Sequence, residues 1–147
     1  DVTFIGLDNC QEFTDICYKK GLNAVIGDMC EMPFETNTAN AVICIASFHH
    51  LINPQRRRQA LYELKRVCKP RGKILLSVWS INQPKKTRRV FTKYGDTIVK
   101  WNQNGVIYDR YYYIFRMKEI NDLFEECGLE VVSHTYVCGN EVFILKA

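Results

Sequence analysis

The stretch NAVICIASFHHL, from Asn40 to Leu51, opens with a nearly continuous apolar run and ends in a histidine pair. Such a run is typical of a central parallel strand that is covered on both faces. Asn53 and Pro54 follow as a helix cap and first helical residue, and apolar residues recur at helical spacing as far as Cys68. A second buried strand is expected at Lys73 to Trp79. The stretch therefore predicts a strand–helix–strand unit.

The amino-terminal part shows the same alternation. A short β-rich stretch, Val2 to Leu7, precedes Asn9 with Glu12 three residues later, a spacing typical of a helix cap with its capping-box partner. Leu22 to Ile26 is the next expected strand. The helix between the two strands is expected to bury one apolar stripe, formed by Phe13, Ile16 and Cys17.

The carboxyl-terminal part ends in two expected strands, around Leu129 to Val137 and Glu141 to Lys146. From about residue 80 to 107 the regular pattern weakens and basic residues accumulate, so we expect a basic insertion there. The alternation predicts a single α/β domain over residues 1–147, in which helices cover both faces of a parallel sheet and an antiparallel hairpin ends the chain.

Composition excludes several classes of protein. The longest apolar runs fall far short of the roughly 20 residues of a membrane helix, and no signal region follows Asp1. The seven cysteines lie singly, without the spacing of zinc ligands, and predict buried free thiols in a reducing compartment. We therefore expect a cytoplasmic domain that has no metal site and does not enter the membrane.

The net charge of +4 is concentrated in two basic groups, which indicate either an anionic partner or a solvated surface. One group places three consecutive arginines in the first turn of a predicted helix, where the helix dipole disfavours cations, and an external phosphate would compensate for this. The other group lies in the expected insertion. The members singled out as candidate phosphate contacts are Arg56, Arg57, Arg58, Lys85, Lys86, Arg88 and Arg89.

Two acidic residues, Asp8 and Asp28, each follow an expected strand, about twenty residues apart. In parallel sheets the ligand binds beyond the carboxyl ends of the strands. A carboxylate there accepts hydrogen bonds from ribose hydroxyls or from the exocyclic amine of adenine. Each residue alone is also a common turn former, and it is their joint placement that favours a nucleoside site.

Four segments in this order resemble the class I methyltransferases that use S-adenosylmethionine: GLD (6–8), GDMCEMPF (27–34), NAVICIASFHHL (40–51) and LKRVCKPRGKILLSVW (64–79). The resemblance implies a Rossmann-like sheet, with Asp8 on the cofactor ribose and Asp28 on the adenine amine. The complete cofactor set that it implies is Asp8, Asn9, Asp28, Met29 and Ala46. The first strand and Gly-rich loop of that fold have no counterpart in the sequence, and we expect a preceding segment to supply them.

Three further segments resemble the eukaryotic tRNA methyltransferases that esterify a carboxymethyl group on the wobble uridine: FHHLINPQRRRQAL (48–61), VWSINQ (78–83) and DRYYYIFRMKEINDLF (109–124). Tyr113 stands where that family commonly has His, and Met117 and Lys118 where it usually has Glu-Gly. The resemblance implies methyl transfer to a carboxylate. The catalytic candidates are His49, Arg110, Tyr111 and Arg116.

Among these candidates, Arg110 is expected to hold the substrate carboxylate, and Arg116 a phosphate or a structural ion pair. If both arginines lay on one strand, they would be roughly 20 Å apart and unable to share a ligand. Only one residue of the histidine pair is expected to face the substrate. Tyr111, Tyr113 and Trp79 are candidates for stacking on a base, or core residues.

The resemblance also implies two partners, tRNA and a small zinc-binding activator subunit that would cover the edge strand near Leu22 to Ile26. Two other functions stay open from the sequence. One is a small-molecule methyltransferase of the same fold, and the other is a non-catalytic methyltransferase-like subunit that binds tRNA.

Overall fold

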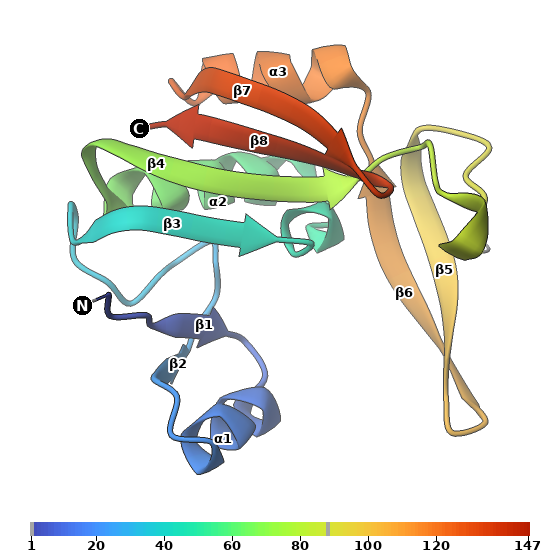
Figure 1. The fold of residues 1–147 in the computed structure, drawn as a ribbon, viewed down its shortest axis with the longest axis horizontal. Helices are drawn as coiled ribbons and strands as arrows, with labels where there is room; N and C mark the ends of the chain where they lie inside the picture. Colours follow the sequence, from blue (N-terminus) through green and yellow to red (C-terminus); the bar gives the residue numbers. More distant parts are fainter. Residues whose placement is uncertain (1, 88) are drawn as a thin grey trace.

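The computed structural model describes residues 2–87 and 89–147, which form an α/β fold (Figure 1). Its elements in chain order are β1 (Gly6–Asp8), α1 (Gln11–Lys19), β2 (Ala24–Ile26), β3 (Ala39–Ile45), η1 (Phe48–His50), α2 (Pro54–Val67), β4 (Cys68–Trp79), η2 (Lys85–Thr87), β5 (Gly95–Gln103), β6 (Val106–Ile114), α3 (Met117–Glu126), β7 (Glu130–Val137) and β8 (Asn140–Lys146).

A four-stranded sheet in the order β3-β4-β8-β7 forms the centre of the fold. β3 and β4 are parallel, whereas β8 is antiparallel to both β4 and β7, so the predicted antiparallel hairpin at the end of the chain is confirmed. The apolar periodicity of α2 buries Ala60, Leu61 and Leu64 against this sheet, and α3 buries Ile120 and Phe124. The side chain of Asn53 accepts the N–H of Arg56 at 2.8 Å, which confirms the predicted cap of α2.

The amino-terminal unit differs from its prediction in two respects. Cys10, not Asn9, is the N-cap of α1. The predicted buried stripe is also wrong, since Phe13 is 58% and Ile16 44% exposed, while Thr14 is buried. The physical reason is that α1 packs against β1 and β2, and these strands of three residues each are too short to cover an apolar face.

A groove of about 910 Å³ separates β1 from β3. Within residues 2–87 and 89–147, β1 pairs only with β2, and β3 has β4 as its one neighbour. Ile43 and Ile45, on the side of β3 that faces away from α2, are 57% and 59% exposed. That a further strand and a Gly-rich loop complete the sheet stays a prediction. The groove offers two open strand edges with which such a strand would pair.

The segment expected to be irregular contains a regular hairpin. β5 and β6, of nine residues each, pair along their whole length, from Gly95 with Ile114 to Gln103 with Val106. Asn104 and Gly105 form the two-residue turn with positive φ angles of 54° and 87°, as the Asn-Gly preference of such turns predicts. The hairpin lies beyond the carboxyl ends of β3 and β4 and projects away from the sheet (Figure 1). That it is an insertion within one domain stays a prediction.

All seven cysteines are free thiols, but they are not uniformly buried. Cys138 is exposed in the turn between β7 and β8, where its φ is 48°. Across the described residues, no helix has both the length and the apolar character needed to span a bilayer. The same residues contain no cluster of three or more metal-ligating side chains.

Candidate functional site

Asp8 is the last residue of β1, and Asp28 lies two residues beyond the end of the neighbouring parallel strand β2. Asp8 pairs with Ile26 in the register of β1 and β2, and the N–H of Gly27 donates to the carbonyl of Asp8 at 2.9 Å. Each carboxylate accepts the backbone N–H two residues later, that of Cys10 at 2.9 Å and that of Cys30 at 2.8 Å. The two acids therefore lie at one edge of the small sheet, as their spacing predicted.

The second oxygen of Asp28 accepts a hydrogen bond from the guanidinium of Arg56 at 2.6 Å. This bond and the one from the N–H of Cys30 hold the pKa of Asp28 below its usual value, so the carboxylate stays ionised. Arg56 was a candidate phosphate contact, and here its charge is already paired. Asp28 therefore supplies the negative charge that compensates for an arginine in the first turn of α2, where the helix dipole disfavours cations.

The residues present fit the nucleoside half of an adenosine-bearing cofactor. Among residues 2–87 and 89–147, Oδ2 of Asp8 has no hydrogen-bond partner, which leaves it able to accept a hydroxyl. Asn9 next to it is exposed. Met29 is part-buried against the core, and Ala46 turns the chain at φ 53° while its N–H donates to the carbonyl of Ser77. The predicted cofactor residues thus all lie at the carboxyl ends of β1, β2 and β3.

His49 of the histidine pair is completely buried. Its Nδ1 accepts the backbone N–H of Trp79 at 2.9 Å, so a neutral ring carries its proton on Nε2. Burial, followed by the nearby His50 and Arg110, lowers the pKa of His49 from 6.5 to about 3. This predicted catalytic residue is therefore a neutral, positioned side chain. Its Nε2 has no hydrogen-bond partner among the described residues.

His50 has the opposite arrangement. Its Nδ1 lies 2.7 Å from the carbonyl oxygen of Tyr111, which only accepts, so Nδ1 carries the proton and Nε2 is an acceptor. The ring is half-buried and packs against that of Tyr112 at 4.3 Å. Burial lowers the pKa of His50 as well. Of the two histidines, His50 is the one that retains contact with solvent.

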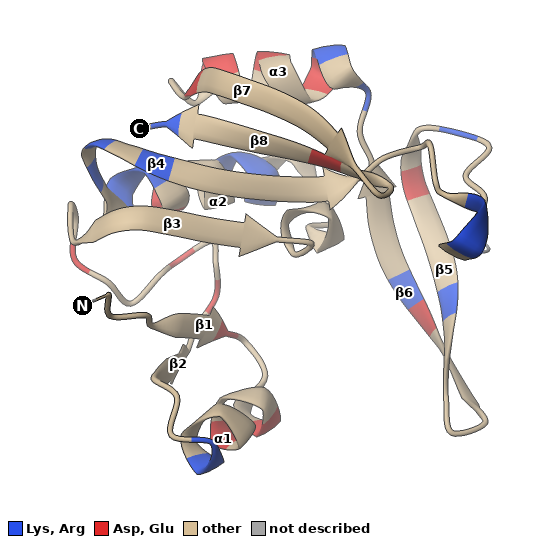
Figure 2. Cartoon of the chain, viewed as in Figure 1, with Lys and Arg blue, Asp and Glu red and all other residues tan. Residues whose placement is uncertain are grey.

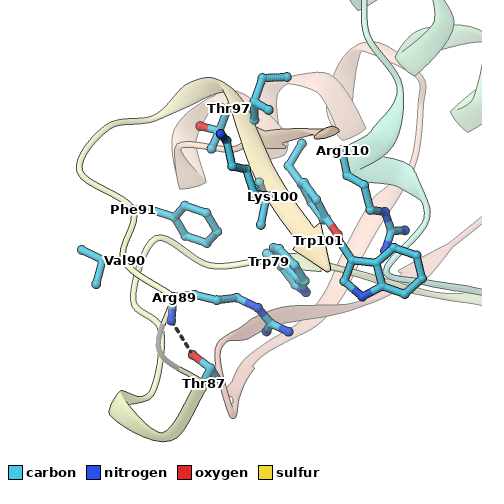
Figure 3. Close-up of a pocket in the computed structure, with 12 residues that line it drawn as sticks. Trp79, Thr87, Arg89, Val90, Phe91, Thr97, Lys100, Trp101 and Arg110 are labelled. Atoms are coloured by element: carbon cyan, nitrogen blue, oxygen red, sulfur yellow. Dashed lines mark hydrogen bonds between the residues drawn. The ribbon is translucent and has the colours of Figure 1, made fainter. Parts of the chain in front are cut away.

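An aromatic and basic pocket of about 510 Å³ lies between the end of β4, the segment after η2 and the hairpin (Figure 3). Trp79 and Tyr112 stack at 4.1 Å with an interplanar angle of 8°. The guanidinium of Arg89 lies 4.2 Å from the Trp79 ring, and that of Arg110 lies 5.8 Å from the Tyr112 ring. Flat rings beside two cations suit a planar ligand with negative charge.

The pocket unites three predicted residues, Trp79, Arg89 and Arg110, but it contains Tyr112 where Tyr111 was expected. The side chain of Tyr111 points to the other face of β6 and donates to Asp96 at 2.5 Å. Burial and this hydrogen bond raise the pKa of Tyr111 to about 12. Side chains alternate along a strand, so identifying the correct tyrosine requires the register of the hairpin, which pairs Tyr112 with Thr97.

Arg57 contradicts its predicted role as a phosphate contact. It is only 4% exposed, and its guanidinium donates to the carbonyls of Leu51 at 3.0 Å and Ile52 at 3.2 Å. It also donates to the Tyr111 hydroxyl and lies 3.5 Å from the ring centroid of Tyr113. Arg57 therefore has a structural role, because its contacts join α2 to β6. The sequence carries no signal that separates it from the arginines beside it.

The other basic candidates have different surroundings. Arg58 pairs with Glu126 at 2.6 Å. β6 ends at Ile114, so Arg116 precedes α3 outside the strand, and its guanidinium lies 4.4 Å from the Tyr94 ring. Lys85 and Lys86 are exposed on η2, near the basic residues of the hairpin (Figure 2). Arg88 lies outside the described residues.

Comparison with known proteins gives one domain family and several relatives. Residues 2–76 match the family described as a methyltransferase domain. The tRNA (carboxymethyluridine(34)-5-O)-methyltransferase of Schizosaccharomyces pombe is 32% identical over 92% of this chain and 68% of its own. The enzyme of the same name from Arabidopsis thaliana is 39% identical over 70% of this chain. The chain spans 25% of that relative's length and 63% of a putative methyltransferase from Encephalitozoon cuniculi.

Solved structures share the fold at low identity. A SAM-dependent methyltransferase from Methanosarcina mazei superposes with a TM-score of 0.77 at 16% identity, over 98% of this chain and 81% of its own. A complex between the Haloferax volcanii Trm112 methyltransferase activator and the putative methyltransferase superposes with a TM-score of 0.71 at 14% identity, over 99% of this chain and 72% of its own.

Proposed function

Since this chain belongs to the family of S-adenosylmethionine-dependent methyltransferases, among the tRNA carboxymethyluridine methyltransferases, we propose that it methylates the wobble uridine of tRNA. The finer proposal is that the acceptor is the carboxylate of 5-carboxymethyluridine and the product its methyl ester. The observation that carries this proposal is the pocket of Trp79, Tyr112, Arg89 and Arg110, where flat rings for a base adjoin cations for a carboxylate.

The acceptor needs no general base. A carboxylate is already ionised at neutral pH, with an ordinary pKa of about 4. This agrees with the histidine pair, because His49 is buried with its pKa lowered to about 3 and Nδ1 occupied. His50 is more suited to accepting a hydrogen bond from the substrate through Nε2, which makes it a positioning group.

The role of the protein is then to orient two reactants and to exclude water. When bound, S-adenosylmethionine supplies a methyl group on a sulfonium. Asp8 and Asp28 would hold its nucleoside, while Arg110 holds the acceptor carboxylate and the rings of Trp79 and Tyr112 border the base. Such orientation lowers a barrier by on the order of 7–11 kcal/mol.

The activator subunit is a further part of the proposal. The amino-terminal unit exposes apolar side chains that the chain itself leaves uncovered: Phe13, Ile16, Leu22 and Ile26, each between 44% and 58% exposed. A protein partner would bury them, and one structural neighbour is a complex between the Trm112 methyltransferase activator and a putative methyltransferase. Replacing Ile26 with Asp is expected to abolish copurification of such a subunit, whereas Ile107→Asp, on the hairpin, is expected to preserve it.

Methyl transfer by the full chain to tRNA that carries 5-carboxymethyluridine tests the reaction. The product is expected to release methanol in mild alkali, as an ester does. Arg110→Ala is expected to lower kcat/KM about ten- to a hundredfold, since a hydrogen bond to a charged group contributes about 1.5–3 kcal/mol.

Lys93→Ala is the matched control, because Lys93 is an exposed cation outside the pocket. It is expected to leave kcat/KM unchanged. Methyl transfer to small carboxylic acids alone, with no dependence on tRNA, would contradict the proposal. An alkali-stable product would contradict the ester.

A further inference from the structure

One face of the β5–β6 hairpin carries aromatic rings and a guanidinium in series. The register places Thr97 opposite Tyr112, Val99 opposite Arg110, and Trp101 opposite Tyr108. Residues directly opposite in an antiparallel pair lie on the same face, as do residues two apart. Tyr112, Arg110 and Tyr108 therefore follow one another along β6, with Trp101 beside them on β5.

This series is continuous with the pocket. Arg110 lies between its two aromatic ends, with its guanidinium 5.8 Å from the Tyr112 ring and 5.4 Å from the Trp101 ring. The rings of Trp101 and Tyr108 are 6.0 Å apart. Trp79, stacked on Tyr112, forms the inner end (Figure 3). The guanidinium of Arg110 thus lies between the inner pair of rings in the pocket and the outer pair on the hairpin.

The outer rings do not form part of the core. Trp101 is 44% and Tyr108 48% exposed, on a hairpin that projects from the sheet. The charge beside them is positive: Arg89 and Arg110 line the same pocket, and among residues 2–87 and 89–147 no acidic side chain does. Exposed rings interleaved with cations fit the bases and phosphates of an unpaired nucleic acid strand, because stacking requires base faces that a duplex hides.

We infer that the hairpin face formed by Trp101, Tyr108 and Arg110 is a stacking platform for unpaired nucleotides next to the one in the pocket. The inference deepens the proposed function and rests on it for the identity of the strand, a tRNA loop. Tyr108 and Tyr112 are four residues apart on β6, or about 13 Å. That length exceeds one stacked step of about 3.4 Å, so the platform would contact at least one flanking base.

Binding of the full chain to a fluorescein-labelled anticodon stem-loop, unmodified and without S-adenosylmethionine, tests the platform by anisotropy. Trp101→Ala and Tyr108→Ala are each expected to weaken binding about tenfold, the loss of one stacked base, while Trp101→Phe retains most of the affinity. A duplex that contains only the stem is expected to bind equally to wild type and variants.

Ile107→Ala is the matched control, since Ile107 is 60% exposed and its register partner Asn102 places it on the opposite face. It is expected to bind like wild type. If the thermal unfolding of the Trp101 and Tyr108 variants is unchanged, their loss of affinity is due to lost stacking. Loss of affinity equal in Ile107→Ala, or equal for the duplex, would overturn the inference.

These assays distinguish a failure of the proposed function from a failure of the stacking platform. Loop binding that depends on Trp101, without methyl transfer by wild type, would refute the proposed reaction and uphold the platform. Methyl transfer by wild type, with Trp101→Ala and Tyr108→Ala binding and reacting normally, would refute the platform alone. Binding to anionic vesicles in preference to the stem-loop would also overturn it.

Discussion

Nδ1 of His49 accepts the backbone N–H of Trp79 at 2.9 Å, and this bond joins η1 to the carboxyl end of β4. It lies beneath the pocket, so the position of the Trp79 ring depends on a neutral imidazole. A protonated ring would carry hydrogens on both nitrogens and repel the donor.

Folding stability is therefore expected to fall below about pH 6.5. The folded chain lowers the pKa of His49 from 6.5 to about 3, so the unfolded chain binds a proton that the folded chain does not. Stability contributed by the neutral ring is present above pH 6.5 and is lost by about 1.4 kcal/mol per pH unit as the pH falls toward 3.

Urea unfolding at several pH values measures this slope. His49→Gln, whose amide oxygen accepts the same N–H, is expected to reduce the slope by about one proton. The pKa of His50 is also lowered, so His50 contributes a slope of the same sign that remains in the His49→Gln variant. Identical slopes in wild type and His49→Gln would show that the ring does not titrate on unfolding.

Arg57 and Arg58 are expected to differ in their contribution to stability, although they are neighbours. Arg57→Ala removes the hydrogen bonds that a buried guanidinium donates to the carbonyls of Leu51 and Ile52, and should cost about 3 kcal/mol. Arg58→Ala removes an exposed pair with Glu126, which solvent screens, and should cost much less than Arg57→Ala. Chemical denaturation measures the free energy of unfolding of the two variants, and similar losses would refute the structural role of Arg57.

Asp8→Asn and Asp28→Asn are each expected to weaken S-adenosylmethionine binding by the full chain about tenfold, since each loses a charged acceptor. Asp122→Asn, an exposed residue of α3 paired with Lys118, serves as control. Calorimetry measures the affinities. If Asp8→Asn bound the cofactor as tightly as Asp122→Asn does, Asp8 would have no place in the nucleoside site.

Binding of tRNA is expected to weaken steeply with salt. The double variant Lys85→Ala, Lys86→Ala should make the slope of log affinity against log salt shallower by about 1–2, one for each lost phosphate contact. Lys19 and Lys20, at the end of α1, are the control pair, because they lie far from η2 (Figure 2). An equal change from both pairs would indicate a diffuse charge effect.

The elements that the sequence predicted well are those with a strong period and a cap. Ala60, Leu61 and Leu64 recur at helical spacing, and Asn53 marks the start of their helix. The expected nucleoside acids also lie as predicted, because parallel strands bring their carboxyl ends to one edge. Local sequence patterns are sufficient for prediction where an element packs against another regular helix or strand.

The sequence predicted less where contacts are distant or exposed. The hairpin has exposed residues on both faces, so its strands lack clean alternation, and Asn104 with Gly105 was the only local signal. Burial of Arg57 depends on Tyr111 and Tyr113, which are distant in sequence. No local property distinguishes such a residue from a solvated arginine.

The chain contains two tryptophans, and both Trp79 and Trp101 line the pocket. All of its indole fluorescence therefore originates within one small volume, beside Arg89 and Arg110. Filling that volume would shift or quench the emission of the whole chain, without a label or an engineered probe. Ligand binding can therefore be followed by intrinsic fluorescence. The variants Trp79→Phe and Trp101→Phe would separate the emission of the inner tryptophan from that of the outer one.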